Sequence, residues 1–199
     1  MTIELILPLI VFAAVSSGTP GPNNLMLLAS GANFGLKRTL PHMLGVSMGH
    51  AFMVFLVGVG LKQIFDAYPL SYLVLKILST VYLLYLAWKI ASNRSLPKQN
   101  RSTGTPLTFL QAAAFQWVNP KAISMAFSAV TIYAPPAPRF ADIVIIALCF
   151  LMVNLPAVSL WAILGQQMSQ FLNTPKRLKA FNITAGLLLV GTLYPILKG

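Results

Sequence analysis

Six long apolar stretches, separated by short polar or basic segments, constrain this chain more than any other feature of its sequence. A helix needs roughly 20 apolar residues to cross the ~30 Å hydrocarbon core of a bilayer. The stretches are continuous rather than alternating in polarity, which favours helices over the strands of a membrane barrel. We therefore expect an all-α, polytopic membrane protein with six transmembrane helices. The expected spans are residues 4–33, 42–61, 69–90, 107–133, 141–165 and 180–197.

Composition supports this fold class and argues against a soluble one. Only 9% of the 199 residues are charged and 57% are hydrophobic, whereas about 25% of the residues in soluble domains are charged. The net charge of +11 arises because acids are scarce, Glu4, Asp66 and Asp142 being the only three. The cations lie between apolar stretches rather than together on one face, so we expect a lipid bilayer and no nucleic acid as partner.

The distribution of Lys and Arg between the loops predicts the orientation in the membrane, because basic loops stay on the cytoplasmic side. One face carries three cations (Lys62, Arg139 and Lys198) and all three acids. We therefore expect a protein of the bacterial inner membrane with both termini in the periplasm. The opposite, cytoplasmic face carries nine cations: Lys37, Arg38, Lys89, Arg94, Lys98, Arg101, Lys176, Arg177 and Lys179.

The longest polar stretch, residues 92–106, is a basic loop that divides a single transmembrane domain (residues 1–199) into two halves. Residues 1–91 and 107–199 each hold three expected helices. Because three is odd, the second half enters the membrane with the opposite polarity. This arrangement predicts two inverted three-helix repeats, which is the plan of many secondary transporters.

Proline, glycine and asparagine interrupt the first and fourth spans near their middles. Residues 16–24 (SSGTPGPNN) contain two prolines that rule out a continuous helix, and residues 119–121 are Asn-Pro-Lys. Broken helices at membrane depth occur where they are buried in protein or line a polar cavity. A matching pair of breaks in two halves points to a transport site, although an ordinary kink is the alternative for either proline segment alone.

We expect the binding site between these two breaks. Pro22 suits the first turn of a new half-helix, whose free N–H groups near Asn23 and Asn24 attract a carboxylate. The carbonyls that end the preceding half-helix could receive an ammonium group, so a small zwitterionic or anionic metabolite suits the site. The expected binding residues are Ser17, Pro20, Gly21, Pro22, Asn23, Asn24, Asn119, Pro120, Lys121 and Asn154.

Asn154 is included because Asn154-Leu155-Pro156 is expected to interrupt the fifth span. Buried asparagines also hold neighbouring helices together by hydrogen bonds. That packing role is the alternative for Asn154, and equally for Asn182 in the sixth span.

Three basic side chains inside the spans, Lys121, His50 and Lys76, are candidates for proton coupling. A charge at the bilayer centre costs about 3 kcal/mol or more, and no acid lies inside a span to pair with Lys121. A lysine that only caps a broken helix end is the alternative for Lys121. The alternative for His50 is a histidine that only packs in the core and is hydrogen-bonded there. The alternative for Lys76 is a side chain that extends its ammonium group to the membrane interface.

Several motifs resemble the lysine-exporter/homoserine–threonine-resistance (LysE/RhtB) family. The resemblance covers essentially the whole chain. It implies export of amino acids or metabolites such as homoserine, threonine, leucine, lysine, cysteine or O-acetylserine, driven by the proton gradient. The Pro-Gly-Pro-Asn-Asn pattern is most similar to the members that handle cysteine and O-acetylserine. The motifs are residues 19–24 (TPGPNN), 44–49 (LGVSMG), 82–90 (YLLYLAWKI) and 115–122 (FQWVNPKA), with Asn182 and Gly186.

These observations together predict a secondary transporter that exports amino acids or small derivatives, and not an enzyme. A passive small-solute channel is one alternative, because pores and transporters share polar residues at membrane depth. An intramembrane protease is another, with Ser17 and His50 as the required pair, but no wider motif supports it. The single cysteine, Cys149, excludes a multi-cysteine metal site, and we expect no metal and no cofactor. The substrate and a homo-oligomeric assembly are left open.

Overall fold

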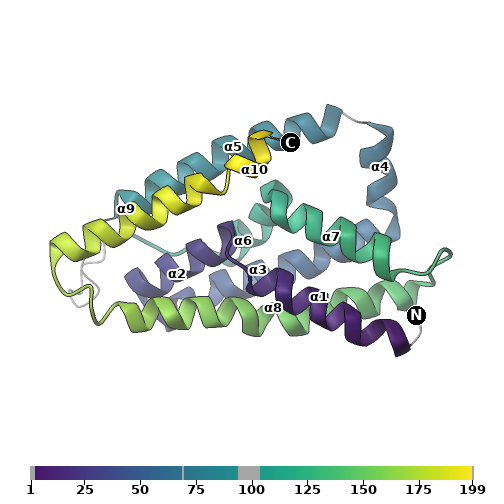
Figure 1. Ribbon diagram of the computed structural model, residues 1–199, viewed down its shortest axis with the longest axis horizontal. Helices are drawn as coiled ribbons and strands as arrows, with labels where there is room; N and C mark the ends of the chain where they lie inside the picture. The colour runs from purple at the N-terminus through teal and green to yellow at the C-terminus, as the bar shows by residue number, and fades with distance from the viewer. Residues whose placement is uncertain (1–2, 69, 94–103, 199) are drawn as a thin grey trace.

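The computed structural model describes residues 3–68, 70–93 and 104–198. All regular secondary structure in these ranges is helical, and none of them forms a strand (Figure 1). Three helical segments are long and apolar enough to cross a membrane: Leu36–Ala67, Leu70–Ala91 and Phe140–Met168. The prediction of an all-α fold is confirmed for the described residues, which include helices apolar enough to span a membrane.

The first half of the chain begins with a helix that is broken in the middle. Gly35 separates this broken helix from the next one, because its φ of 78° lies in the left-handed region that favours glycine. Gly60, with φ of 127°, bends the following run in the same way. The elements are η1 (Ile3–Leu5), α1 (Ile6–Gly18), α2 (Pro22–Phe34), α3 (Leu36–Leu56), η2 (Val57–Leu61), α4 (Lys62–Ala67) and α5 (Leu70–Ala91).

The second half also begins with a broken helix. Thr108 starts it with a capping box, in which the backbone N–H of Gln111 donates to Thr108 Oγ1 at 3.2 Å and the N–H of Thr108 donates to Gln111 Oε1 at 3.1 Å. The elements are α6 (Phe109–Phe115), η3 (Gln116–Val118), α7 (Pro120–Tyr133), α8 (Phe140–Met168), α9 (Pro175–Gly191) and α10 (Tyr194–Lys198).

The helices differ from the expected spans at three places. The second span begins at Leu36 rather than at residue 42, because Gly35 ends α2 and Pro41 is accommodated inside α3. The expected interruption at Asn154-Leu155-Pro156 is wrong, since α8 is continuous over 29 residues. A proline removes one N–H donor, and the remaining turns of α8 continue past it. The sixth span begins at Pro175, where the Thr174 side chain caps α9.

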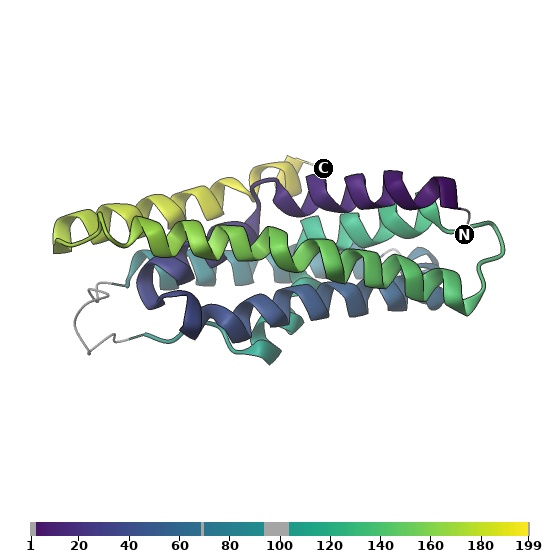
Figure 2. The same ribbon diagram turned by 90° about the horizontal axis from the view of Figure 1, so that it is seen from below.

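Helix α8 extends along the length of the molecule in both views (Figures 1 and 2). It packs against α1, α2 and α3, while α3 also packs against α6, and α5 packs against α9. Glycines allow the closest approaches. A Cβ at Gly49 of α3 would lie 2.6 Å from Cα of Ala113 in α6, and one at Gly165 of α8 would collide with the backbone of Leu28 in α2. These contacts hold the two broken helices close to α3 and α8.

The two larger apolar clusters of the buried core share helices α3 and α8. One contains Met26, Val46 and Val158, and the other contains Ala13, Val54, Met125, Ile146 and Phe150. Along α8, Asn154 lies between the members of the two clusters. The two helix breaks are therefore placed in a polar layer between two apolar ones.

Candidate functional site at the helix breaks

The two helix breaks face each other through one side chain. Lys121, at the start of α7, extends its ammonium group to the segment between α1 and α2. Its Nζ donates to the carbonyl oxygen of Thr19 at 2.7 Å, to Thr19 Oγ1 at 2.8 Å and to the carbonyl oxygen of Pro20 at 3.4 Å. These hydrogen bonds connect Lys121 to Thr19, which lies 102 positions earlier in the sequence.

Helix dipoles explain the direction in which Lys121 points. A lysine in the first turn of a helix lies at the positive end of the dipole, which is unfavourable for a cation. The carbonyls at the C-terminal end of α1 carry the opposite partial charge. The ammonium of Lys121 therefore lies away from the N-terminal end of α7 and close to the C-terminal end of α1, where a cation is favourable. Backbone carbonyls there accept its hydrogen bonds in place of an acidic side chain.

Gly21 provides the room for the lysine side chain. Its φ of −175° is extended backbone that any residue adopts, so the glycine is not explained by conformation. A Cβ at this position would lie 2.7 Å from Cδ and 3.2 Å from Nζ of Lys121. The missing side chain therefore allows the lysine to pass.

Asn23 and Asn24 fix the start of α2 to both halves of the molecule. Asn24 Nδ2 donates to the carbonyls of Ser17 and Thr19, each at 2.8 Å. Asn23 and Gln116 exchange two amide hydrogen bonds, of 2.8 Å and 3.2 Å. Asn23 thus connects the break in the first span to the break in the fourth. Asn24 closes the turn at the end of α1.

Asn154 joins three helices at the same level. Its Nδ2 donates to Ser17 Oγ in α1 at 3.0 Å, and its Oδ1 accepts from Ser47 Oγ in α3 at 3.0 Å. The side chain is buried, and two polar partners satisfy it in an apolar environment. Asn154 therefore lines a cavity at this level and also joins helices, while its role in binding stays a prediction.

Two buried polar groups at the site have no partner among the described residues. Both ring nitrogens of His50, whose residue is 1% exposed, lack a hydrogen-bond partner in this part of the chain, as does Oδ1 of Asn119. The imidazole of His50 packs edge-on against the ring of Phe150, with centroids 5.2 Å apart. Since buried polar groups are normally paired, these atoms are the ones best placed to bind a polar solute.

The side chains of the layer surround a cavity of about 20 Å³, which is room for about one water molecule. A solute can enter only if the surrounding helices separate. Lys76 is not among the lining residues. The expected residues Pro22 and Pro120 begin α2 and α7, and Pro20 contributes a carbonyl. The expected residues that line the cavity are Ser17, Gly21, Asn23, Asn24, His50, Asn119, Lys121 and Asn154.

Sequence reasoning missed three residues at this site. Thr19 accepts two of the lysine hydrogen bonds, and Gln116 pairs with an asparagine across the two breaks. Thr19 lies inside the first interrupted segment and Gln116 three residues before Asn119, so their polarity at membrane depth was a usable signal. The third is Trp161, whose Nε1 donates to the carbonyl of Gly18 at 3.1 Å, and nothing in the sequence indicates that contact.

The carbonyls that we expected to be open to an ammonium group already have donors from the protein. Those of Ser17, Gly18 and Thr19 accept from Asn24, Trp161 and Lys121 respectively. A solute cation that binds here must therefore displace a side chain. Of these donors, the flexible lysine side chain moves at the lowest cost.

Comparison with known proteins gives a consistent family signal. The model of the family described as LysE type translocators matches residues 14–192. The cysteine/O-acetylserine efflux protein of Klebsiella pneumoniae is 28% identical over 83% of this chain and 84% of its own length. The homoserine/homoserine lactone efflux protein of Salmonella typhimurium is 26% identical over 97% of each chain. The cysteine/O-acetylserine efflux protein of Escherichia coli is 26% identical over 96% of each. No solved structure matches the chain.

Proposed function

The chain belongs to the family of LysE type translocators, and from this membership we propose that it is a secondary transporter exporting amino acids or small amino-acid derivatives. The similar proteins are named for efflux of cysteine, O-acetylserine, homoserine and homoserine lactone. The first three compounds are small zwitterions with one carboxylate and one ammonium group. A site that contains two helix N-termini and a set of carbonyls suits both ends of such a solute.

The observation that carries this proposal is the contact of Lys121 with Thr19 and Pro20 between two broken helices. The substrate ammonium takes the place of Lys121 on these carbonyls, at 2.7 Å and 3.4 Å from Nζ in the structure. The substrate carboxylate then pairs with the released lysine and with the start of α2. Binding and release of a substrate are thereby linked to a movement of one charged side chain.

Export is coupled to the proton gradient in this proposal. The acids of the chain, Glu4, Asp66 and Asp142, do not line the cavity. The proton carrier is therefore Lys121, His50 or the substrate itself. His50 has both ring nitrogens unpaired among the described residues, which leaves it available to exchange a proton.

A transporter agrees with the geometry better than a passive channel does. The cavity of about 20 Å³ lies between two buried apolar clusters, and a channel requires a continuous polar path. An alternating opening of the two sides meets this requirement without ever forming such a path.

The same proposal includes six spans arranged as two inverted repeats in the bacterial inner membrane. The second helices of the two halves, α3 and α8, pack together, and so do the third helices, α5 and α9. Each second helix also packs against the broken helix of the other half. A two-fold relation between the halves predicts these pairings, and the loop charges favour periplasmic termini.

Reconstitution into proteoliposomes tests the function. Vesicles loaded with L-homoserine or L-cysteine should release it in a protein-dependent manner, faster when an inward proton gradient is imposed, and a protonophore should abolish that acceleration. Lys121→Met should reduce the release at least about 10-fold. Lys179→Met, which removes the same charge from an exposed position of α9, is the matched control. Release that is insensitive to the gradient would favour a channel, and no release of any amino acid tested would refute the proposal.

A further inference from the structure

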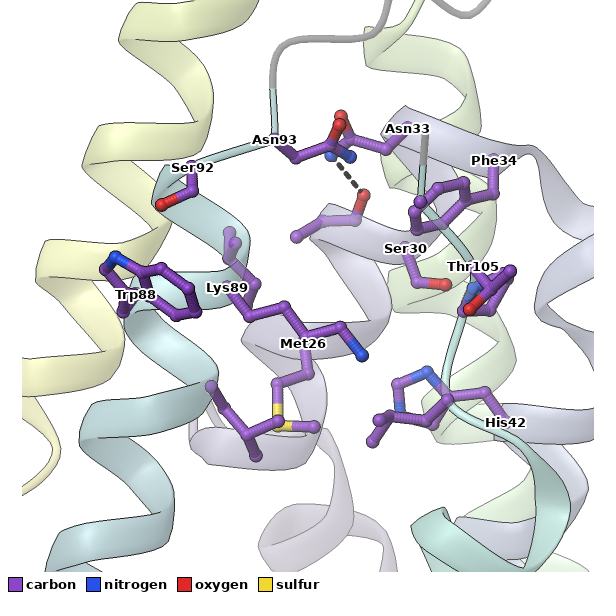
Figure 3. A pocket seen from close by; sticks show the side chains of 16 residues that line it. Met26, Ser30, Asn33, Phe34, His42, Trp88, Lys89, Ser92, Asn93 and Thr105 are labelled. Carbon is purple, nitrogen blue, oxygen red and sulfur yellow. Dashed lines mark hydrogen bonds between the residues drawn. The ribbon is translucent and has the colours of Figure 1, made fainter. Parts of the chain in front are cut away.

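A second and larger cavity lies on the side of the molecule where α2 ends and α3 begins. It has a volume of about 250 Å³, near the lower end of the range of about 300 to 1,000 Å³ that is typical of small-molecule sites. The C-terminal part of α2, the start of α3, the end of α5 and residues 104–107 surround it (Figure 3). Its walls are mostly apolar and include Met26, Phe34 and Leu86.

His42 is the buried polar group of this cavity. The residue is 2% exposed, and neither Nδ1 nor Nε2 has a hydrogen-bond partner among the described residues. A buried imidazole without partners is costly. One ring N–H is always available to donate to an acceptor that enters the cavity.

Lys89 places a positive charge beside this imidazole. Figure 3 shows the ammonium end of Lys89 pointing toward the ring of His42 from the end of α5. Within the described ranges, no residue forms an ion pair with Lys89, and none of the lining residues is acidic. Two donors that converge on a cavity without an acid recognise an anion, and a carboxylate accepts from both.

The cavity shares two helices with the helix-break site. Helix α2 contributes Asn24 to the break site and Met26 and Ser30 to this cavity, while α3 contributes His50 and His42 respectively. The two histidines are eight residues apart, which is about 12 Å along an α-helix. The two cavities therefore lie along the same pair of helices.

We propose that this cavity binds a small carboxylate-bearing solute through Lys89 and His42, and that it is the cytoplasmic loading site of the exporter. The binding itself stands on the geometry of the cavity, whereas the loading role rests on the proposed function. The carboxylate lies between the ammonium and the imidazole, and the solute's remaining part contacts the apolar wall. The basic residues of this face, among them Lys37 and Arg38, favour the cytoplasmic side.

Equilibrium binding to the purified full-length protein in detergent tests the site. Labelled L-homoserine and L-cysteine are the probes, and L-serine methyl ester, which lacks the carboxylate, serves as a competitor that should fail. We expect Lys89→Gln to weaken binding about 10-fold or more, because it removes a charged hydrogen-bond donor. His42→Asn should act in the same direction. Lys37→Gln, an exposed residue of the same face, should leave the affinity unchanged.

Transport from each side separates the two proposals. In proteoliposomes, Lys89→Gln should raise the KM for solute on the cytoplasmic side about 10-fold with little change in maximal rate. Carboxylate-dependent binding without any export would defeat the proposed function and leave the site intact. Unchanged affinity in Lys89→Gln, equal competition by the methyl ester, or no saturable binding of either probe would overturn the site. Binding that is lost in Lys121→Met but kept in Lys89→Gln would assign the solute to the helix breaks instead, and would also overturn it.

Discussion

Replacing Gly21 by alanine tests the role of the lysine that joins the two helix breaks. The added Cβ would lie 2.7 Å from Cδ of Lys121 and 3.2 Å from its Nζ. Carbon atoms pack at about 3.5 to 4.0 Å, so the lysine stem must move away by roughly 0.8 Å or more. The hydrogen bonds from Nζ to Thr19, now 2.7 and 2.8 Å long, would then stretch beyond the ordinary range.

The magnitude follows from the strength of hydrogen bonds to a charged group, which contribute about 1.5 to 3 kcal/mol. If transport depends on the position of Lys121, losing one such bond should slow export about 10- to 100-fold. The stability of the fold should change little. The displaced atoms belong to a flexible side chain, and alanine adopts the extended backbone at Gly21 without strain.

The assay is solute release from proteoliposomes, combined with thermal unfolding of the same preparation in detergent. Gly18→Ala is the matched control, because a Cβ at Gly18 would meet no other described part of the chain within 4 Å. The reasoning is refuted if Gly21→Ala exports at the wild-type rate. It is equally refuted if Gly18→Ala is impaired to the same extent, or if Gly21→Ala is inactive only because it unfolds.

Two further predictions concern the packing that supports the site. Asn33 and Asn182 exchange buried amide hydrogen bonds of 2.7 and 3.0 Å between α2 and α9. The double alanine variant should therefore lose about 1 kcal/mol less unfolding free energy than the two single variants lose together. Additive losses in unfolding free energy would contradict the pairing. A Cβ at Gly31 would collide with the carbonyl of Ala162 in α8, so Gly31→Ala should cost about 1 to 3 kcal/mol. A Cβ at Gly191 would meet no other described residue within 4 Å, so Gly191→Ala should have no such cost. Equal thermal unfolding of the two variants would count against the close packing of α2 on α8.

The helix ends show how far local sequence rules extend. Pro22 and Pro120 each occupy the first position of a half-helix, as their missing N–H and fixed φ predict. The same rule fails at Pro156, which lies inside a continuous α8. The difference is that the first two prolines follow Gly21 and Asn119, which adopt extended backbone. Beside Pro156, by contrast, Asn154 and Val158 are buried, and α8 packs against α1, α2 and α3.

The site shows a similar division. The sequence indicates that Asn24, Lys121 and Asn154 are polar residues at membrane depth, where each needs a partner. Which partner each one has is decided by contacts between residues that are far apart in the chain. Lys121 contacts Thr19, 102 positions away, and Asn154 contacts Ser17, 137 positions away. No local pattern encodes such pairs.

The apolar stretches and their breaks are therefore what the sequence by itself determines. Hydrocarbon thickness sets the length of each span, and proline chemistry sets the places where the backbone must open. Only the tertiary structure decides that the two breaks meet and that Gly21 leaves space for the side chain of Lys121. It also decides that a second cavity forms beside His42 and Lys89. The physical reason is that burial and hydrogen-bond satisfaction depend on which helices are neighbours, and that choice is made by the packing of the whole chain.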